Sequence, residues 1–153
     1  MIASPYELAE RFIGTQEVNG QLDNPQVMAW LTTDNTWPEH DEVPWCSGFV
    51  NWVCKIMRAP RSKSLMARSW LGVGRPIRLE EARAGWDVCI FSRGGENEPG
   101  PDVLDAPGHV AFFSALGDEK MVFVLGGNQG NKVSVSRYER RRLLGVRRVK
   151  EIR

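Results

Sequence analysis

Three widely separated residues have the types and the chain order of a thiol nucleophile, its base and an orienting amide. Cys46 follows Pro44 and opens an apolar run of helical period, so we expect it in the first turn of a helix. The free backbone N–H groups and the helix dipole at such a position stabilise a thiolate. His109 begins a strand-like run far downstream, and Asn128 ends another one. Such a set can attack an amide carbonyl through sulfur.

Each of these residues also has a plainer structural interpretation. As a base, His109 would take the thiol proton and return it to the leaving amine, whereas a structural histidine would only be hydrogen-bonded. Asn128 would accept a hydrogen bond from the far ring nitrogen and fix the tautomer. It is also a common turn residue in a glycine-rich stretch such as 126–130. Cys54, in the middle of the same helix, fits a buried cysteine, and His40 fits a surface or substrate-facing position.

The pattern along the chain indicates helices first and strands afterwards. Helices are predicted over residues 4–13, 26–31, 45–57 and 64–71, and strands over 88–92, 109–115, 121–125, 132–137 and 144–149. The stretch 93–108 is rich in glycine and proline, so we expect a surface loop near the site. Residues 1–153 are therefore predicted to form a single α+β domain, with N-terminal helices packed on a C-terminal antiparallel sheet of about five strands.

The charges are unevenly distributed although the net charge is only +1. Residues 137–153 are strongly basic, while 39–42 and 96–105 are acidic. A basic end attracts polyanionic surfaces, and positive charge also protects the edge strands of a sheet, so both interpretations stay open. No nucleic-acid-binding motif and no aromatic interleaving accompany the basic run, so we expect no nucleic-acid partner.

The cysteine and histidine content gives no sign of a metal or a disulfide framework. Three cysteines and two histidines are scattered along the chain without zinc-ligand spacing, and we expect no metal and no cofactor. The N-terminus lacks the pattern of a signal peptide, and no apolar stretch approaches the roughly 20 residues of a membrane span. The sequence thus predicts a protein made in the cytoplasm, and any action outside the cytoplasm would require its release or injection.

Four short motifs carry a resemblance to a known group of enzymes. Trp-Cys-Ser-Gly-Phe-Val, Gly-His-Val-Ala and Gly-Gly-Asn-Gln resemble the CHAP and NlpC/P60 peptidoglycan hydrolases. A compact phage-associated branch is similar over more of the chain, through the motifs at 41–46, 67–70, 108–110 and 125–129. The resemblance implies a papain-like fold with Cys46 as nucleophile, His109 as base and Asn128 as orienting residue. The same motifs supply five candidate substrate contacts, which are Asp41, Trp45, Arg68, Trp70 and Gln129.

The resemblance also implies an activity, with several alternatives. We expect an endolysin-like peptidoglycan hydrolase that cuts an amide bond, as an amidase or an endopeptidase, and acts as a monomer. Peptidoglycan would be the partner, with anionic envelope polymers bound through the basic C-terminus, and the protein would act at the cell wall or periplasm after release or injection. The alternatives are an injected antibacterial effector with the same chemistry, a non-catalytic binding module, and a thiol enzyme that acts on proteins. For Arg68 and Trp70 the alternative is a helix packed on the sheet through Trp70, with Arg68 exposed to solvent. Calcium is not expected, because the spacing of Asp34 and Asp41 does not match the calcium loop of some CHAP domains.

Overall fold

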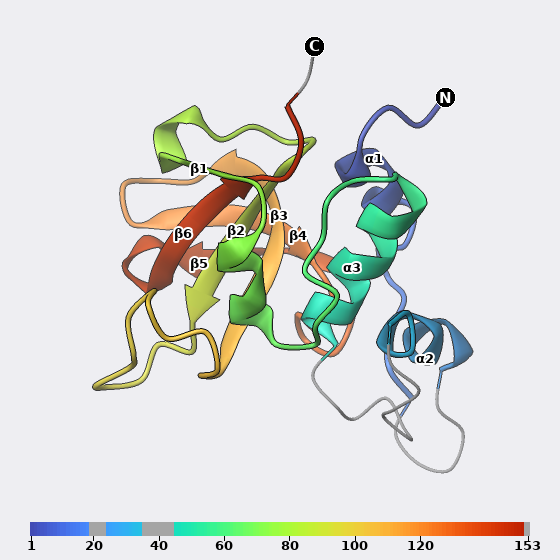
Figure 1. Cartoon of the computed structure of the whole chain (residues 1–153), viewed down its shortest axis with the longest axis horizontal. Helices are drawn as coiled ribbons and strands as arrows, with labels where there is room; N and C mark the ends of the chain where they lie inside the picture. Colours follow the sequence, from blue (N-terminus) through green and yellow to red (C-terminus); the bar gives the residue numbers. More distant parts are fainter. Residues whose placement is uncertain (19–23, 35–44, 152–153) are drawn as a thin grey trace.

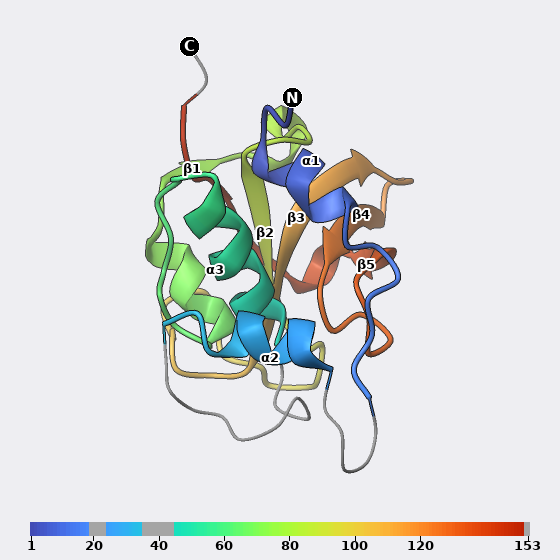
Figure 2. The same cartoon turned by 90° about the vertical axis from the view of Figure 1, so that its right-hand side faces the viewer.

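In the described part of the chain, three helices lie on one side of a six-stranded antiparallel sheet. The computed structural model describes residues 1–18, 24–34 and 45–151. The helices are α1 (Pro5–Glu10), α2 (Pro25–Leu31) and α3 (Cys46–Ile56), and Figures 1 and 2 show them gathered on the same side of the sheet. The strands are β1 (Arg75–Ile77), β2 (Asp87–Ser92), β3 (Gly108–Leu116), β4 (Met121–Gly126), β5 (Ser134–Glu139) and β6 (Leu143–Arg148). They lie in the order β1-β6-β2-β3-β4-β5, so β2 and β3 are central.

The first two helices begin where the sequence predicts. The Ser4 hydroxyl accepts a hydrogen bond from the backbone N–H of Glu7, with Pro5 in the first turn of α1. The Asn24 side chain accepts one from the N–H of Gln26, with Pro25 in the first turn of α2. A side-chain acceptor satisfies an N–H that has no partner inside the helix, and proline loses nothing at this position.

The two faces of β3 contribute to two different cores. Val110 and Phe112 face the helices and pack with Phe49 and Val50 of α3. Ala111 and Phe113 face the other way, into a second apolar cluster that includes Val122, Val124 and Val146. Side chains alternate along a strand, so His109 lies on the same face as Ala111. The sheet curls around this second cluster, which brings Tyr138 of β5 against Phe91 of β2.

The structure departs from the predicted elements in two places. The sheet has six strands rather than about five, because Arg75–Ile77 pairs with β6 as a short β1. A three-residue strand that contains Pro76 has too little pattern to be recognised from sequence. The predicted helix over 64–71 is a 3₁₀ segment, η1 (Ala67–Gly72), which packs against β2 and β3.

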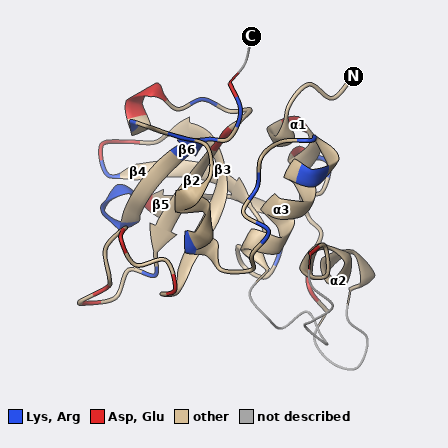
Figure 3. Ribbon diagram, in the orientation of Figure 1, with Lys and Arg blue, Asp and Glu red and all other residues tan. Residues whose placement is uncertain are grey.

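Several C-terminal arginines hold the sheet and its loops together. The Arg140 side chain donates to the Met121 carbonyl, Arg142 to Ser92 and Arg147 to Leu71, while Arg148 forms a buried ion pair with Asp87. Basic and acidic residues are interspersed along the loops (Figure 3). Several arginines of the basic stretch 137–153 therefore stabilise the fold. Binding of anionic polymers by this stretch stays a prediction. None of the helices formed by the described residues combines the length and apolar character required to cross a bilayer.

Candidate active site

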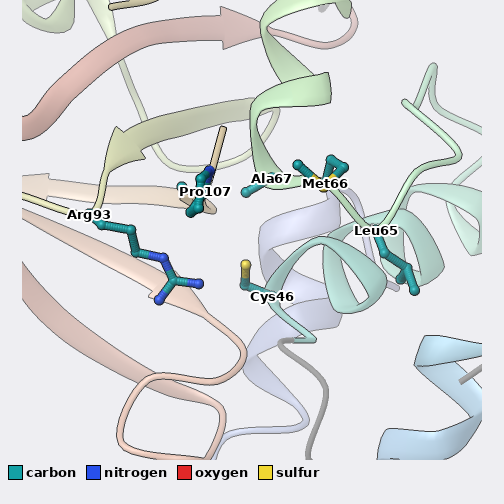
Figure 4. Close-up of a pocket in the computed structure, with 7 residues that line it drawn as sticks. Cys46, Leu65, Met66, Ala67, Arg93 and Pro107 are labelled. Atoms are coloured by element: carbon teal, nitrogen blue, oxygen red, sulfur yellow. The ribbon is translucent and has the colours of Figure 1, made fainter. Parts of the chain in front are cut away.

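Cys46 is the first residue of α3 and lines a pocket of about 340 Å³. Figure 4 shows its sulfur directed into this pocket. The start of the helix is fixed by Trp45, whose indole N–H donates to the Glu17 carboxylate at 2.9 Å. The Trp45 ring packs against Gly127 so closely that a Cβ there would lie 2.6 Å from it. The candidate nucleophile Cys46 thus lies at a helix end whose position is fixed by the contacts of Trp45.

A buried polar network ties this helix end to the pocket wall. The Ser47 hydroxyl donates to the Ser64 carbonyl at 2.6 Å and accepts from the indole N–H of Trp70 at 2.9 Å. The Asn51 amide donates to the same Ser64 carbonyl at 3.0 Å. Residues 65–67, which line the pocket, follow directly after Ser64. Their distance from Cys46 is therefore set by buried hydrogen bonds.

His109 faces Cys46 from the start of β3. Gly108 before it lets β3 lie close to β2 and to Arg68, because a Cβ at 108 would lie 2.7 Å from the Phe91 carbonyl oxygen and 3.0 Å from the Arg68 Cγ. Burial is the largest influence on the thiol of Cys46 and raises its pKa. The charge of His109, its hydrogen bond, the backbone N–H of Val110 and the charge of Arg93 together outweigh burial, and the pKa of Cys46 is lowered. This is the arrangement expected of an activated thiol.

Gln129, rather than Asn128, lies against the far nitrogen of His109. The distance from His109 Nε2 to Gln129 Oε1 is 2.9 Å, and both side chains are buried. The Gln129 NH₂ group donates to the Ser134 carbonyl at 2.6 Å and is 3.4 Å from the Val124 carbonyl. Since these carbonyls only accept, the amide oxygen must face His109. The sequence motifs predict Asn128 in this role and Gln129 among the substrate contacts.

The orientation of Gln129 determines the tautomer of a neutral His109. An amide oxygen accepts only, so His109 Nε2 carries the proton and donates it. In the neutral ring the Nδ1 atom is then unprotonated and available to the thiol of Cys46. After proton transfer, the imidazolium keeps the Gln129 acceptor at Nε2. The thiol proton of Cys46 can therefore move to Nδ1 while Nε2 keeps its hydrogen bond to Gln129.

The glycine-rich turn explains why the side chain of residue 129 reaches His109. A Cβ at Gly126 would lie 2.9 Å from Gln129 Oε1 and 2.7 Å from the Ala111 Cβ, so only glycine leaves space for the amide. Asn128 has a φ of 59°, in the left-handed region where asparagine is tolerated. Asn128 turns the chain, and the next side chain points back to the histidine.

Aromatic stacking fixes the plane of the His109 ring. The Tyr138 ring lies parallel to it, with centroids 4.9 Å apart and an interplanar angle of 9°. Phe91 stacks on Tyr138 at 4.8 Å, and the Arg142 guanidinium lies 5.2 Å from the Tyr138 centroid. Burial raises the pKa of Tyr138 although Arg142 opposes it, so the phenol stays neutral. The sequence does not indicate a role for Tyr138, because no local pattern relates β5 to β3.

Three of the predicted substrate contacts lie inside the protein instead. Trp45, Arg68 and Trp70 have no exposed surface, and none of them lines the pocket. Arg68 is buried under the β2–β3 loop and donates to four of its backbone carbonyls, those of Pro99, Gly100, Val103 and Pro107. Its Nη2 atom is 3.7 Å from the Glu98 carboxylate. Arg68 thus shapes the segment that leads to His109. Asp41 and His40 lie outside the described residues.

The pocket itself is lined mainly by apolar side chains. Besides Cys46 and Gly108, its walls are Leu65, Met66, Ala67, Arg93 and Pro107. Arg93 and Pro107 belong to the loop that the sequence placed near the site. Within the described ranges, no group of three or more His, Cys, Asp and Glu side chains is arranged to hold a metal ion.

Comparison with known proteins finds a likeness in structure. No family model matches the sequence, and a search of curated proteins found no match. The structure of NlpC1 from Trichomonas vaginalis superposes over 97% of this chain with a TM-score of 0.53 and 14% sequence identity. The fold is NlpC-like. The aligned region spans 45% of the NlpC1 chain, so less than half of that protein is represented here. At this identity the likeness concerns the fold alone.

Proposed function

We propose that this protein is a cysteine hydrolase that cleaves an amide bond in peptidoglycan. The observation that carries the proposal is the buried set Cys46, His109 and Gln129. In it the thiol with a lowered pKa faces a histidine whose other nitrogen is held by an amide oxygen. The NlpC-like fold and the motifs around Cys46 and His109 support it further.

In the proposed reaction, His109 Nδ1 accepts the proton of the Cys46 thiol and the thiolate attacks the carbonyl carbon of the amide. The backbone N–H of Cys46, one of the unpaired N–H groups at the start of α3, stabilises the negative oxygen. The imidazolium of His109 then returns its proton to the leaving nitrogen, the C–N bond breaks and a thioester to Cys46 remains. A water molecule, deprotonated by His109, attacks the thioester and releases the acid and the free thiol.

Gln129 keeps its place through all of these steps. Its oxygen accepts from His109 Nε2 in both the neutral and the protonated ring, so the ring does not need to reorient between proton uptake and release. Tyr138 stacks on the face of the same ring, where its π-electrons favour the imidazolium. Both residues act through His109 and neither touches the substrate.

The finer proposal is an endolysin-like amidase or endopeptidase. Its support is the resemblance of the four sequence motifs to the phage-associated branch, which covers the nucleophile, the histidine and the Gly-Gly-Asn-Gln turn. An antibacterial effector of the same chemistry is an equal alternative, since both cut the same polymer.

The test is turbidity loss of Gram-negative cells whose outer membrane has been permeabilised, with digested walls analysed by mass spectrometry. We expect lysis by the native protein and none by Cys46→Ala, and the new chain ends identify the bond. The matched control is Cys54→Ala, which removes a thiol eight residues further along the same helix and should lyse normally. A folded native protein that releases no fragment from any wall type tested would contradict the proposal and favour a binding module or a protein-directed enzyme.

A further inference from the structure

Arg93 is a charged group beside the nucleophile that has no step of its own in the proposed reaction. It follows directly after β2 and lines the pocket opposite the N-terminus of α3. Figure 4 shows its guanidinium extending toward Cys46 across the pocket. The side chain is exposed, and no described residue forms a hydrogen bond or an ion pair with it.

The remaining pocket walls are apolar, so Arg93 sets the charge of the site. It is the sole charged residue among the described residues that line the pocket, whose other walls include Leu65, Met66 and Pro107. The nearby Glu98 carboxylate is engaged by the buried Arg68. Its guanidinium is therefore the group in the pocket wall that attracts an anion.

The backbone around Arg93 is fixed although its side chain is unpaired. Arg142 donates from Nε and Nη2 to the Ser92 carbonyl, at 3.2 and 3.0 Å. Its side chain packs so closely on Gly94 that a Cβ there would lie 2.8 Å from Arg142 Nε. The residues on both sides of Arg93 are therefore held in place. Arg142 also brings a second positive charge near this side of the pocket.

We propose that Arg93 binds a carboxylate of the substrate next to the amide that is cleaved, so that the enzyme selects acidic peptides. This rests on the proposed function for the identity of the nucleophile. A planar guanidinium can hold a carboxylate through two parallel hydrogen bonds, which fixes both position and orientation. The apolar walls would take up the adjoining aliphatic part of the substrate.

Alkylation of Cys46 tests the carboxylate site without any wall substrate. Iodoacetate and iodoacetamide place the same reactive carbon beside a carboxylate or a neutral amide, and both react with the thiolate. The ratio of their rates on one protein is therefore independent of how much thiolate is present. We expect Arg93→Gln to lower the ratio of iodoacetate to iodoacetamide rates at Cys46 by about fivefold. The native rate with iodoacetate should also saturate as its concentration rises, and Arg93→Lys should retain part of the preference.

Arg83→Gln is the matched control, because it removes the same charge from an exposed position before the opposite end of β2. Its ratio should equal the native one. An unchanged ratio in Arg93→Gln, or a native preference that never saturates, would overturn the carboxylate site.

The second arm uses wall peptides whose carboxylates have been converted to methylamides. Native protein should cleave them about fivefold more slowly than the acidic peptides, whereas Arg93→Gln should cleave both at one rate. Equal discrimination by both proteins would overturn the proposal while leaving the hydrolase intact. An altered haloacetate ratio in a protein that cleaves no wall peptide would support the anion site and contradict the proposed function.

Discussion

The two cysteines of α3 have opposite properties although they share one helix and both are buried. The pKa of Cys46, in the first turn, is lowered, while burial raises the pKa of Cys54 to about 12. Cys54 has Arg61 alone to oppose burial, and Cys46 has His109, the Val110 N–H and Arg93. On this helix, burial alone raises the pKa of a thiol, and the groups that β3 and the β2–β3 loop bring to Cys46 lower it.

Removing the histidine should abolish most of the difference between the two cysteines. In His109→Ala nothing accepts the thiol proton, and burial then dominates the pKa of Cys46, as it does for Cys54. We expect wall hydrolysis to fall about a thousandfold. The measurement is the rate of fragment release from purified walls at constant pH, with circular dichroism to verify folding. Hydrolysis within tenfold of native would show that His109 is not the base.

Arg68→Met should destabilise the β2–β3 loop, which leads to His109. The substitution removes the side-chain donor of four loop carbonyls, among them that of Pro107, two residues before His109. We expect the free energy of unfolding to fall by about 3 kcal/mol in urea titration. Labelling of Cys46 should also slow, while that of Cys54 should not change.

Arg78→Met provides the control for Arg68, because Arg78 is exposed and pairs only with Glu81 on the surface. Its effect on stability should stay below about 1 kcal/mol. A comparable loss in both variants would show that the buried guanidinium has no special structural role.

Gln129→Ala tests the orienting residue. Without the amide oxygen, the Nε2 proton of His109 has no acceptor in the interior and the ring loses one of its constraints. We expect the hydrolysis rate to fall about tenfold, which corresponds to one lost buried hydrogen bond. The rate should be measured across pH, because a ring that is free to change tautomer alters the profile as well as the maximum.

Asn128→Gly should have the smallest effect. Glycine adopts the positive φ of this position readily, so we expect activity within about twofold of native and stability within about 1 kcal/mol. The same wall-hydrolysis assay, run beside Gln129→Ala, decides between the two amides. A larger loss in Asn128→Gly than in Gln129→Ala would restore Asn128 as the orienting residue.

The sequence alone predicts the positions of Cys46 and His109, because a helix start and a strand start are local patterns. It does not distinguish Asn128 from Gln129, since that depends on one left-handed φ and on the space left by Gly126. It also does not predict that Arg68 is buried beneath the β2–β3 loop. A pattern of residue types shows which side chains are close in sequence, but the side of η1 that turns inward depends on packing against β2 and β3.

The most direct test of the central claim is the pH dependence of iodoacetamide labelling in the folded protein, resolved to individual cysteines by mass spectrometry. Only the thiolate reacts, and a lowered pKa keeps Cys46 ionised to lower pH than an ordinary thiol. Labelling of Cys46 should therefore remain fast below the usual thiol range and decline only as pH falls through its lowered pKa. Cys54, with a pKa of about 12, should stay unlabelled up to about pH 10. Equal labelling of the two cysteines at every pH would contradict an activated Cys46.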